Sequence, residues 1–205
     1  MNDVNAIADT FIEEAPMVYV GDLIDEAACQ NILTEFAEEA RWIQAQVTTY
    51  TETDNGQGSI KSIIDLDRRL ARRIHFCDLD MQSKPHTHAA LSVIKKEVAT
   101  FVERELGFRT SDFGDEEIVR YPVGGKFVPH SDANKLKAYR ALSIVLYLND
   151  DYEGGKTSFP LLNYACSPKA GRVLVFNSQL LHAGDPILSG EKFIIVLWAF
   201  YPGGK

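Results

Sequence analysis

Two histidines and one aspartate have the residue types and spacing to bind a metal. His130 and Asp132 are separated by a single residue, and His182 lies further along the chain. Two imidazoles and one carboxylate are the ligands of the facial triad that holds non-heme Fe(II) and leaves positions open. Zinc or magnesium can use similar ligands, but vacant positions suit a chelating cosubstrate and O2 better. The three residues therefore suggest an iron site for oxygen chemistry, in which they are both the catalytic residues and the metal ligands.

A lysine near the end of the chain suggests a partner for that site. Lys192 begins the apolar segment KFIIVLWAFY, and alternation along a strand puts it on the same side as Ile194, Val196 and Trp198. A buried ammonium is costly without a counter-charge, and a bound dicarboxylate would supply one. The alternative is that Lys192 begins the strand at the surface, and position alone leaves both readings open.

The second part of the chain supplies the strands that must position these residues. Its apolar segments are rich in Val, Ile, Leu, Tyr and Phe and are bounded by Gly, Pro, Asn or Asp, which predicts strands at 116–121, 138–148, 171–176 and 192–201. Short antiparallel strands in this number are typical of a jelly roll, which brings distant strands together. On an extended strand His130 and Asp132 point to one face, so His182 can complete the triad from another strand.

The first part of the chain reads mostly as helices with some strand. Asp25 is a candidate N-cap before a helix, and a second helix is expected from about Thr87 to Leu106, with Gly107 as its stop. The polar segment TTYTETDNGQG at 48–58 predicts a surface loop, and a lid over the site is the open alternative. The fold class is thus α+β and mainly β, a double-stranded β-helix (jelly roll) core with a supporting N-terminal helical layer. We expect one domain over 1–205, with helical support and flanking strands at about 1–112 and the catalytic jelly roll at about 113–205.

Composition and charge limit the binding partners and the cellular compartment that we expect for this protein. The 205 residues carry a formal net charge of −8, which argues against direct binding of nucleic acid. The three cysteines, Cys29, Cys77 and Cys166, are far apart and include no CxxC pair, which favours free thiols in a reducing compartment. The acidic N-terminus is no signal peptide, and no apolar run is long enough to span a bilayer. We therefore expect a cytoplasmic protein without a membrane partner.

Six segments resemble the prolyl 4-hydroxylase-type 2-oxoglutarate/Fe(II)-dependent dioxygenases. Their order and spacing agree with that family over about 116–201. The matching segments are Tyr121 to Asp132 (YPVGGKFVPHSD), Leu146 to Asn149 (LYLN), Tyr152 to Pro160 (YEGGKTSFP), Pro168 to Phe176 (PKAGRVLVF), Leu181 to Ile187 (LHAGDPI) and Gly190 to Lys192 (GEK).

The resemblance implies a role for several residues. It places His130, Asp132 and His182 on the iron ligands. Lys192 falls on the residue that binds the distal carboxylate of 2-oxoglutarate, with the hydroxyls of Tyr121 and Thr157 beside it. Arg140 and Trp198 fall near positions associated with substrate binding in some members. The family motif Gly-Gly-Glu-Thr reads Gly-Gly-Lys-Thr here, which keeps the threonine.

The activity implied by the resemblance is hydroxylation of an unactivated C–H bond. Its requirements are Fe(II), 2-oxoglutarate as cosubstrate and O2, with ascorbate as a supporting reductant. Asp132 favours hydroxylation, because related halogenases lack the carboxylate ligand. The expected substrate is a prolyl or other residue of a peptide or protein. The alternatives are a free amino acid or other small metabolite and, from another class, a non-catalytic metal-binding jelly-roll module. The sequence leaves the oligomeric state open.

Two further histidine positions are better explained by structure than by metal binding. His86 and His88 also have one residue between them, but they follow a proline and precede the second helix, which predicts a polar first turn. His75 lies between apolar neighbours, so we expect a hydrogen-bonded structural histidine.

Overall fold

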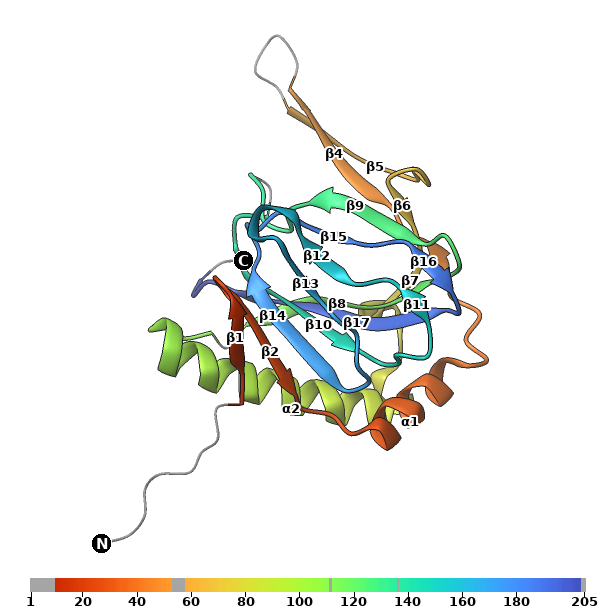
Figure 1. The fold of residues 1–205 in the computed structure, drawn as a ribbon, viewed down its shortest axis with the longest axis horizontal. Helices are drawn as coiled ribbons and strands as arrows, with labels where there is room; N and C mark the ends of the chain where they lie inside the picture. The colour runs from red at the N-terminus through yellow and green to blue at the C-terminus, as the bar shows by residue number, and fades with distance from the viewer. Residues whose placement is uncertain (1–9, 53–57, 111, 136, 204–205) are drawn as a thin grey trace, which may run out of the picture.

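Two β-sheets face each other, and two helices cover the outer face of the larger sheet (Figure 1). The computed structural model describes residues 10–52, 58–110, 112–135 and 137–203. The larger sheet has eight strands, in the spatial order β1 (Ile12–Ala15), β2 (Val18–Asp22), β14 (Arg172–Asn177), β10 (Arg140–Tyr147), β17 (Lys192–Phe200), β8 (Phe113–Tyr121), β7 (Arg72–His75) and β3 (Ile43–Gln44).

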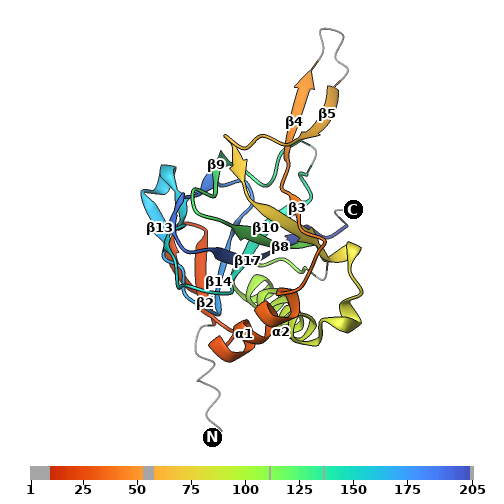
Figure 2. The same ribbon diagram turned by 90° about the vertical axis from the view of Figure 1, so that its right-hand side faces the viewer.

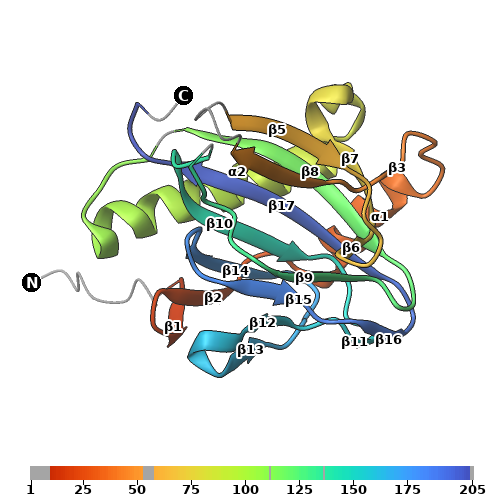
Figure 3. The same cartoon turned by 90° about the horizontal axis from the view of Figure 1, so that it is seen from above.

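The smaller sheet lies across from it, as Figure 3 shows from above. Its five strands are β13 (Tyr164–Cys166), β12 (Thr157–Phe159), β15 (His182–Gly184), β9 (Lys126–His130) and β6 (Arg69–Leu70). Two strand pairs complete the structure: β11 (Glu153–Gly154) with β16 (Ile187–Ser189), and β4 (Val47–Glu52) with β5 (Gly58–Ile63). Strands far apart in the sequence thus become neighbours, and the predicted mainly-β jelly roll with helical support is confirmed.

The larger sheet separates two hydrophobic cores, as the alternation of side chains along a strand requires. On β10, Ile144 and Leu146 face the helices. Val145 and Tyr147 face the smaller sheet. The inner face therefore carries the side chains that border the site.

The two predicted helices are present, with small shifts at their ends. Helix α1 (Glu26–Phe36) begins as expected after Asp25, whose Oδ1 accepts a 2.7 Å hydrogen bond from the backbone N–H of Ala28. Helix α2 (Pro85–Phe101) begins two residues earlier than expected, and the Glu35 carboxylate accepts hydrogen bonds from the N–H groups of the first turn. A π-helical turn, Val102–Leu106, leads to Gly107, whose φ of 72° ends the helix as predicted. None of the helices in the described ranges is long and apolar enough to cross a membrane.

The loop predicted at 48–58 was wrong for most of its length. Residues Val47–Glu52 and Gly58–Ile63 are the antiparallel strands β4 and β5, which project from the body of the protein (Figure 2). Polar composition hid the strands, although Thr and Tyr, which are frequent at 48–51, are residues that favour strands. The tip of the predicted lid, residues 53–57, lies outside the described residues. The first part of the chain also supplies more of the sheets than expected, with four strands in the larger sheet and β6 in the smaller.

Candidate metal centre

The three predicted ligands meet at one end of the smaller sheet. His130 ends β9 and His182 begins β15, and the two residues are directly paired across these strands. Asp132 follows two residues after His130, and its backbone N–H donates a 3.0 Å hydrogen bond to Ser178 O. The Asp132 carboxylate oxygens lie 3.6 Å from Nε2 of each histidine, and the three ligand atoms lie within 4.8 Å of one another. This set of one oxygen and two imidazole nitrogens fits a divalent metal that takes facial ligands.

Neighbouring groups fix the orientation of each ligand. Nδ1 of His130 is 2.8 Å from Val128 O, and Nδ1 of His182 is 3.0 Å from Leu180 O. A carbonyl only accepts, so each Nδ1 carries the proton and each Nε2 is free to bind metal. The Ser143 hydroxyl donates a 2.7 Å hydrogen bond to Oδ2 of Asp132.

Electrostatics keep two of these ligands in the form that binds metal. Burial lowers the pKa of His130 to about 3, with a further lowering by the neighbouring His182. Burial alone would raise the pKa of Asp132, but His182, His130 and the Ser143 hydroxyl outweigh it and bring it to about 2. A neutral imidazole and an ionised carboxylate are thus present over most of the pH range.

A cavity of about 870 Å³ extends from the triad, with Lys192 in its wall. Lys192 is 3% exposed, and its Nζ donates a 2.6 Å hydrogen bond to Gly155 O. It lies over the rings of Tyr121 and Tyr147, at 5.5 and 5.2 Å from their centroids. No carboxylate of the described residues pairs with it, and burial lowers the pKa of Lys192 to about 8. The sequence left open whether Lys192 is buried or at the surface, and the structure shows that it is buried. Its ammonium still needs a counter-charge.

The two hydroxyl residues predicted beside Lys192 also line the cavity. Tyr121 is paired with Lys192 across β8 and β17, and Thr157 lies at the start of β12. The Thr157 hydroxyl is 2.7 Å from the Tyr147 hydroxyl. Tyr147 was not singled out from the sequence, although it shares its strand with Ser143 and alternates to the same face.

Arg140 and Trp198 form a different wall of the same cavity. The guanidinium of Arg140 lies 3.5 Å from the centroid of the Trp198 ring, and Nη2 donates a 2.6 Å hydrogen bond to Asp115 Oδ2. Asp115 has a φ of 56°, which is uncommon outside glycine, at an irregularity between β8 and β17. The irregular backbone directs this carboxylate toward the cavity.

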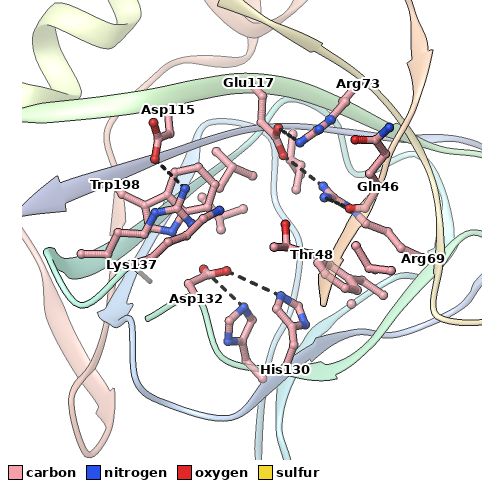
Figure 4. A pocket seen from close by; sticks show the side chains of 18 of the residues that line it. Gln46, Thr48, Arg69, Arg73, Asp115, Glu117, His130, Asp132, Lys137 and Trp198 are labelled. Carbon is pink, nitrogen blue, oxygen red and sulfur yellow. Dashed lines mark hydrogen bonds and ion pairs between the residues drawn. The ribbon is translucent and has the colours of Figure 1, made fainter. Parts of the chain in front are cut away.

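Glu117 carries a buried charge network that was not predicted. Its carboxylate is 3% exposed and pairs with Arg69 at 3.0 Å and with Arg73 at 2.9 Å (Figure 4). These guanidiniums outweigh the effect of burial and lower the pKa of Glu117. Glu117 shares the inward parity of Tyr121 on β8, which is the signal that would have revealed it.

Arg69 also connects this network to the triad. Its guanidinium lies 4.6 Å from the centroid of the Phe127 ring, which stacks on His130 with the ring centroids 3.5 Å apart.

The remaining histidines lie away from the triad. His86 and His88 are exposed in the first turn of α2 as expected, and neither belongs to a metal-binding group among the described residues. His75 is half-buried, with Nδ1 3.6 Å from Glu117 Oε2, so it borders the cavity as a member of the Glu117 network.

Known proteins share both sequence and fold with this chain. The 2OG-Fe(II) oxygenase superfamily profile matches residues 117–200. A putative prolyl 4-hydroxylase of Acanthamoeba polyphaga mimivirus is 45% identical over 69 residues, which span 29% of this chain and 28% of that protein. A PKHD-type hydroxylase of Synechococcus sp. is 25% identical over 184 residues, 86% of this chain and 74% of that protein.

Two solved structures have the same fold over most of the chain. A Pseudomonas putida prolyl-4-hydroxylase has a TM-score of 0.69 and 18% identity, covering 90% of this chain and 92% of that one. A Trichoplax adhaerens prolyl hydroxylase, in complex with a peptide fragment of the hypoxia inducible factor oxygen degradation domain, has a TM-score of 0.70 and 14% identity, covering 92% and 85%. The profile match over residues 117–200 and the relatives support a prolyl 4-hydroxylase-like 2OG-Fe(II) oxygenase, and the solved structures show that the chain has the same fold.

Proposed function

We propose that this protein uses Fe(II), 2-oxoglutarate and O2 to hydroxylate a prolyl or other residue of a peptide or protein. The observation that carries the proposal is one cavity whose wall holds two features. His130, Asp132 and His182 converge in this wall, which also contains a buried lysine without a carboxylate partner among the described residues.

Each residue has a role that its surroundings support. Nε2 of each histidine and an Asp132 oxygen would hold the iron, which with 2-oxoglutarate and O2 would supply the chemistry that converts C–H to C–OH, one oxygen atom of O2 entering the product and the other the succinate formed with CO2. Lys192 would bind the distal carboxylate of 2-oxoglutarate, with Tyr121 and Thr157 as hydrogen-bond partners. The apolar part of the cavity wall excludes water near the site; it includes Val145, Phe176, Ile194 and Val196.

The size of the cavity favours a peptide over a free amino acid. Its volume of about 870 Å³ is near the upper end of small-molecule pockets. Its wall runs from Thr48 and Ser62 on the β4–β5 hairpin to Tyr139. Arg140 and Trp198 would contact the substrate, with Asp115 holding the guanidinium in place. The relatives described as prolyl 4-hydroxylases, and the peptide bound to the Trichoplax enzyme, support the same choice.

Succinate release tests this proposal. The protein is incubated with Fe(II), ascorbate and 2-oxoglutarate, alone and with proline-containing peptides or free amino acids, and hydroxylated products are identified by mass. We expect stimulation by peptides and a mass gain of one oxygen on the target residue. If only free amino acids stimulate succinate release, the substrate is a small molecule and not a peptide. The absence of succinate under every condition would favour a non-catalytic metal-binding module.

Three accompanying proposals concern the setting of the reaction. We expect ascorbate to support turnover by keeping the iron reduced, which omission tests. We propose a cytoplasmic location, since the three cysteines are free and Cys29 and Cys166 are buried thiols; fractionation tests it. We also propose a single domain, because the core under the helices combines Ile32 and Leu91 with Ile144 and Ile195. One cooperative unfolding transition would agree with that.

A further inference from the structure

The cationic side chains around the cavity differ in whether they have a counter-charge. Arg69 and Arg73 share Glu117, and Arg140 is paired with Asp115. Lys192 lies where the cosubstrate would supply a carboxylate. Two other lysine or arginine residues of the described ranges line the cavity: Arg68, which is exposed, and Lys137, which remains to be accounted for.

Lys137 is a lysine without a partner at the side of the metal site. It lies between β9 and β10, is half-buried, and lines the same cavity as Asp132. Its ammonium makes no hydrogen bond or ion pair with any residue of the described ranges. Burial and the neighbouring guanidinium of Arg140 lower the pKa of Lys137, while the charges of Asp115 and Asp132 oppose that shift. Figure 4 shows Lys137 and Trp198 on the side of the pocket opposite Arg69.

The wall around Lys137 offers hydrogen-bond donors rather than free acceptors. Nε of Arg140 and Nε1 of Trp198 are both buried, and neither has an acceptor among the described residues. The Asp115 carboxylate is already engaged by Arg140. A ligand that brings both negative charge and acceptor atoms would therefore complement this wall.

We propose that Lys137 is a specificity-determining residue that binds a carboxylate of the substrate close to the residue that is hydroxylated. The proposal rests on the proposed function, because it takes the cavity to be the substrate site. An acidic side chain next to the target residue and the C-terminal carboxylate of a peptide have the same chemistry. The protein has a formal net charge of −8, so general attraction to acidic peptides would not produce the preference.

Paired peptides measure the preference directly. The probes are acetyl-Ala-Pro-Asp-amide against acetyl-Ala-Pro-Asn-amide, and acetyl-Ala-Pro with a free C-terminus against its amide. Binding is measured by calorimetry on protein loaded with Mn(II) and 2-oxoglutarate, so the readout does not require turnover. We expect one carboxylate probe to bind about tenfold more tightly than its matched amide, which corresponds to about 1.4 kcal/mol.

Four variants assign the preference to one side chain. Lys137→Met should equalise the paired affinities, and Lys137→Glu should reverse their order. Lys137→Arg should retain the preference, which rules out a folding defect as the cause. Lys135→Met is the matched control, because Lys135 is exposed on the same loop and lies outside the cavity wall.

The outcomes separate this proposal from the proposed function. If only the Asp peptide binds more tightly than its amide, the carboxylate that Lys137 binds is that of an acidic side chain. If only the peptide with a free C-terminus does so, it is the C-terminal carboxylate of the peptide. Equal binding of every pair by the wild type, including no binding, contradicts the role of Lys137, as does a preference that survives in Lys137→Met. Peptide-free succinate release and Mn(II) affinity report on the proposed function independently.

Discussion

Replacing Lys192 by methionine should stabilise the ligand-free protein while removing its response to 2-oxoglutarate. The side chain is 3% exposed, and no carboxylate of the described residues pairs with it. Methionine fills a similar volume without a charge. If Lys192 binds a dicarboxylate, its buried ammonium destabilises the folded protein as long as the cosubstrate is not bound.

The size of this burden follows from the pKa of Lys192, which falls from 10.5 to about 8. Each pKa unit corresponds to about 1.4 kcal/mol, so the ammonium destabilises the folded protein by roughly 3 kcal/mol at neutral pH. The variant also leaves Gly155 O, now 2.6 Å from Nζ, without its donor, a loss of about 1–2 kcal/mol. The net gain is roughly 1–2 kcal/mol, and Tm should rise by about 2–8 °C for a chain of this length.

The pH dependence of unfolding separates the effect of the ammonium charge on stability from the effect of the lost hydrogen bond. Because the folded-state pKa is lower than the unfolded one, the unfolded chain holds more protons between pH 8 and 10.5. Wild-type stability should therefore rise through that window, and its difference from Lys192→Met should shrink. Urea denaturation of both proteins at pH 7.5 and 9.5, without metal or 2-oxoglutarate, measures this.

A surface lysine provides the control for this experiment. Lys156→Met replaces an exposed lysine near Thr157 and should change stability by less than about 0.5 kcal/mol. Added 2-oxoglutarate with Mn(II) should raise the Tm of the wild type but not of Lys192→Met. A variant gap that stays constant from pH 7.5 to 9.5, or an undiminished response to 2-oxoglutarate, would refute the reasoning.

Four other expectations follow from the site. Asp132→Ala should abolish Mn(II) binding and 2-oxoglutarate turnover, and unimpaired turnover would remove the aspartate from the iron site. Ser143→Ala loses a 2.7 Å hydrogen bond to that carboxylate and should weaken Mn(II) affinity by about 10–100-fold in calorimetry; an unchanged affinity would contradict the supporting role. Glu117→Gln leaves two buried arginines short of charge and should destabilise the protein by about 3–5 kcal/mol in urea denaturation, against about 1 kcal/mol at most for the neighbouring Glu116→Gln. The pKa of His130 is about 3 in the folded protein, so the unfolded chain takes up a proton on this histidine at a higher pH than the folded protein does. The free energy of unfolding of the metal-free protein should therefore fall as the pH drops below about 6.5. A His130→Asn variant with the same pH dependence would refute this.

The sequence predicted the elements whose patterns are local. The apolar strands β10, β14 and β17 could be predicted from their composition and from the turn residues on either side of them. The N-cap of helix α1 could be predicted from one residue, Asp25. Strand parity at Lys192 left a buried and a surface position open, and the structure shows the buried one. Parity failed for β4 and β5, since the mostly polar segment 48–58 has no regular apolar alternation.

The rest of the site depends on contacts that no local pattern encodes. Glu117 meets Arg69 and Arg73 across three strands, so only the fold shows that these charges neutralise one another. Lys137 lies in a segment between strands, where neither parity nor periodicity assigns a direction. The same limit applies to Asp115, whose left-handed backbone has no signature in its sequence.

An anaerobic crystal structure with Mn(II) and 2-oxoglutarate tests the central claim most directly. The account predicts one metal ion bound by Nε2 of His130, Nε2 of His182 and an oxygen of Asp132. It also predicts the distal carboxylate of 2-oxoglutarate within ion-pair distance of Lys192 Nζ, leaving Lys137 free for the substrate. A metal bound elsewhere, or a 2-oxoglutarate whose distal carboxylate lies on Lys137 with Lys192 still unpaired, would contradict it.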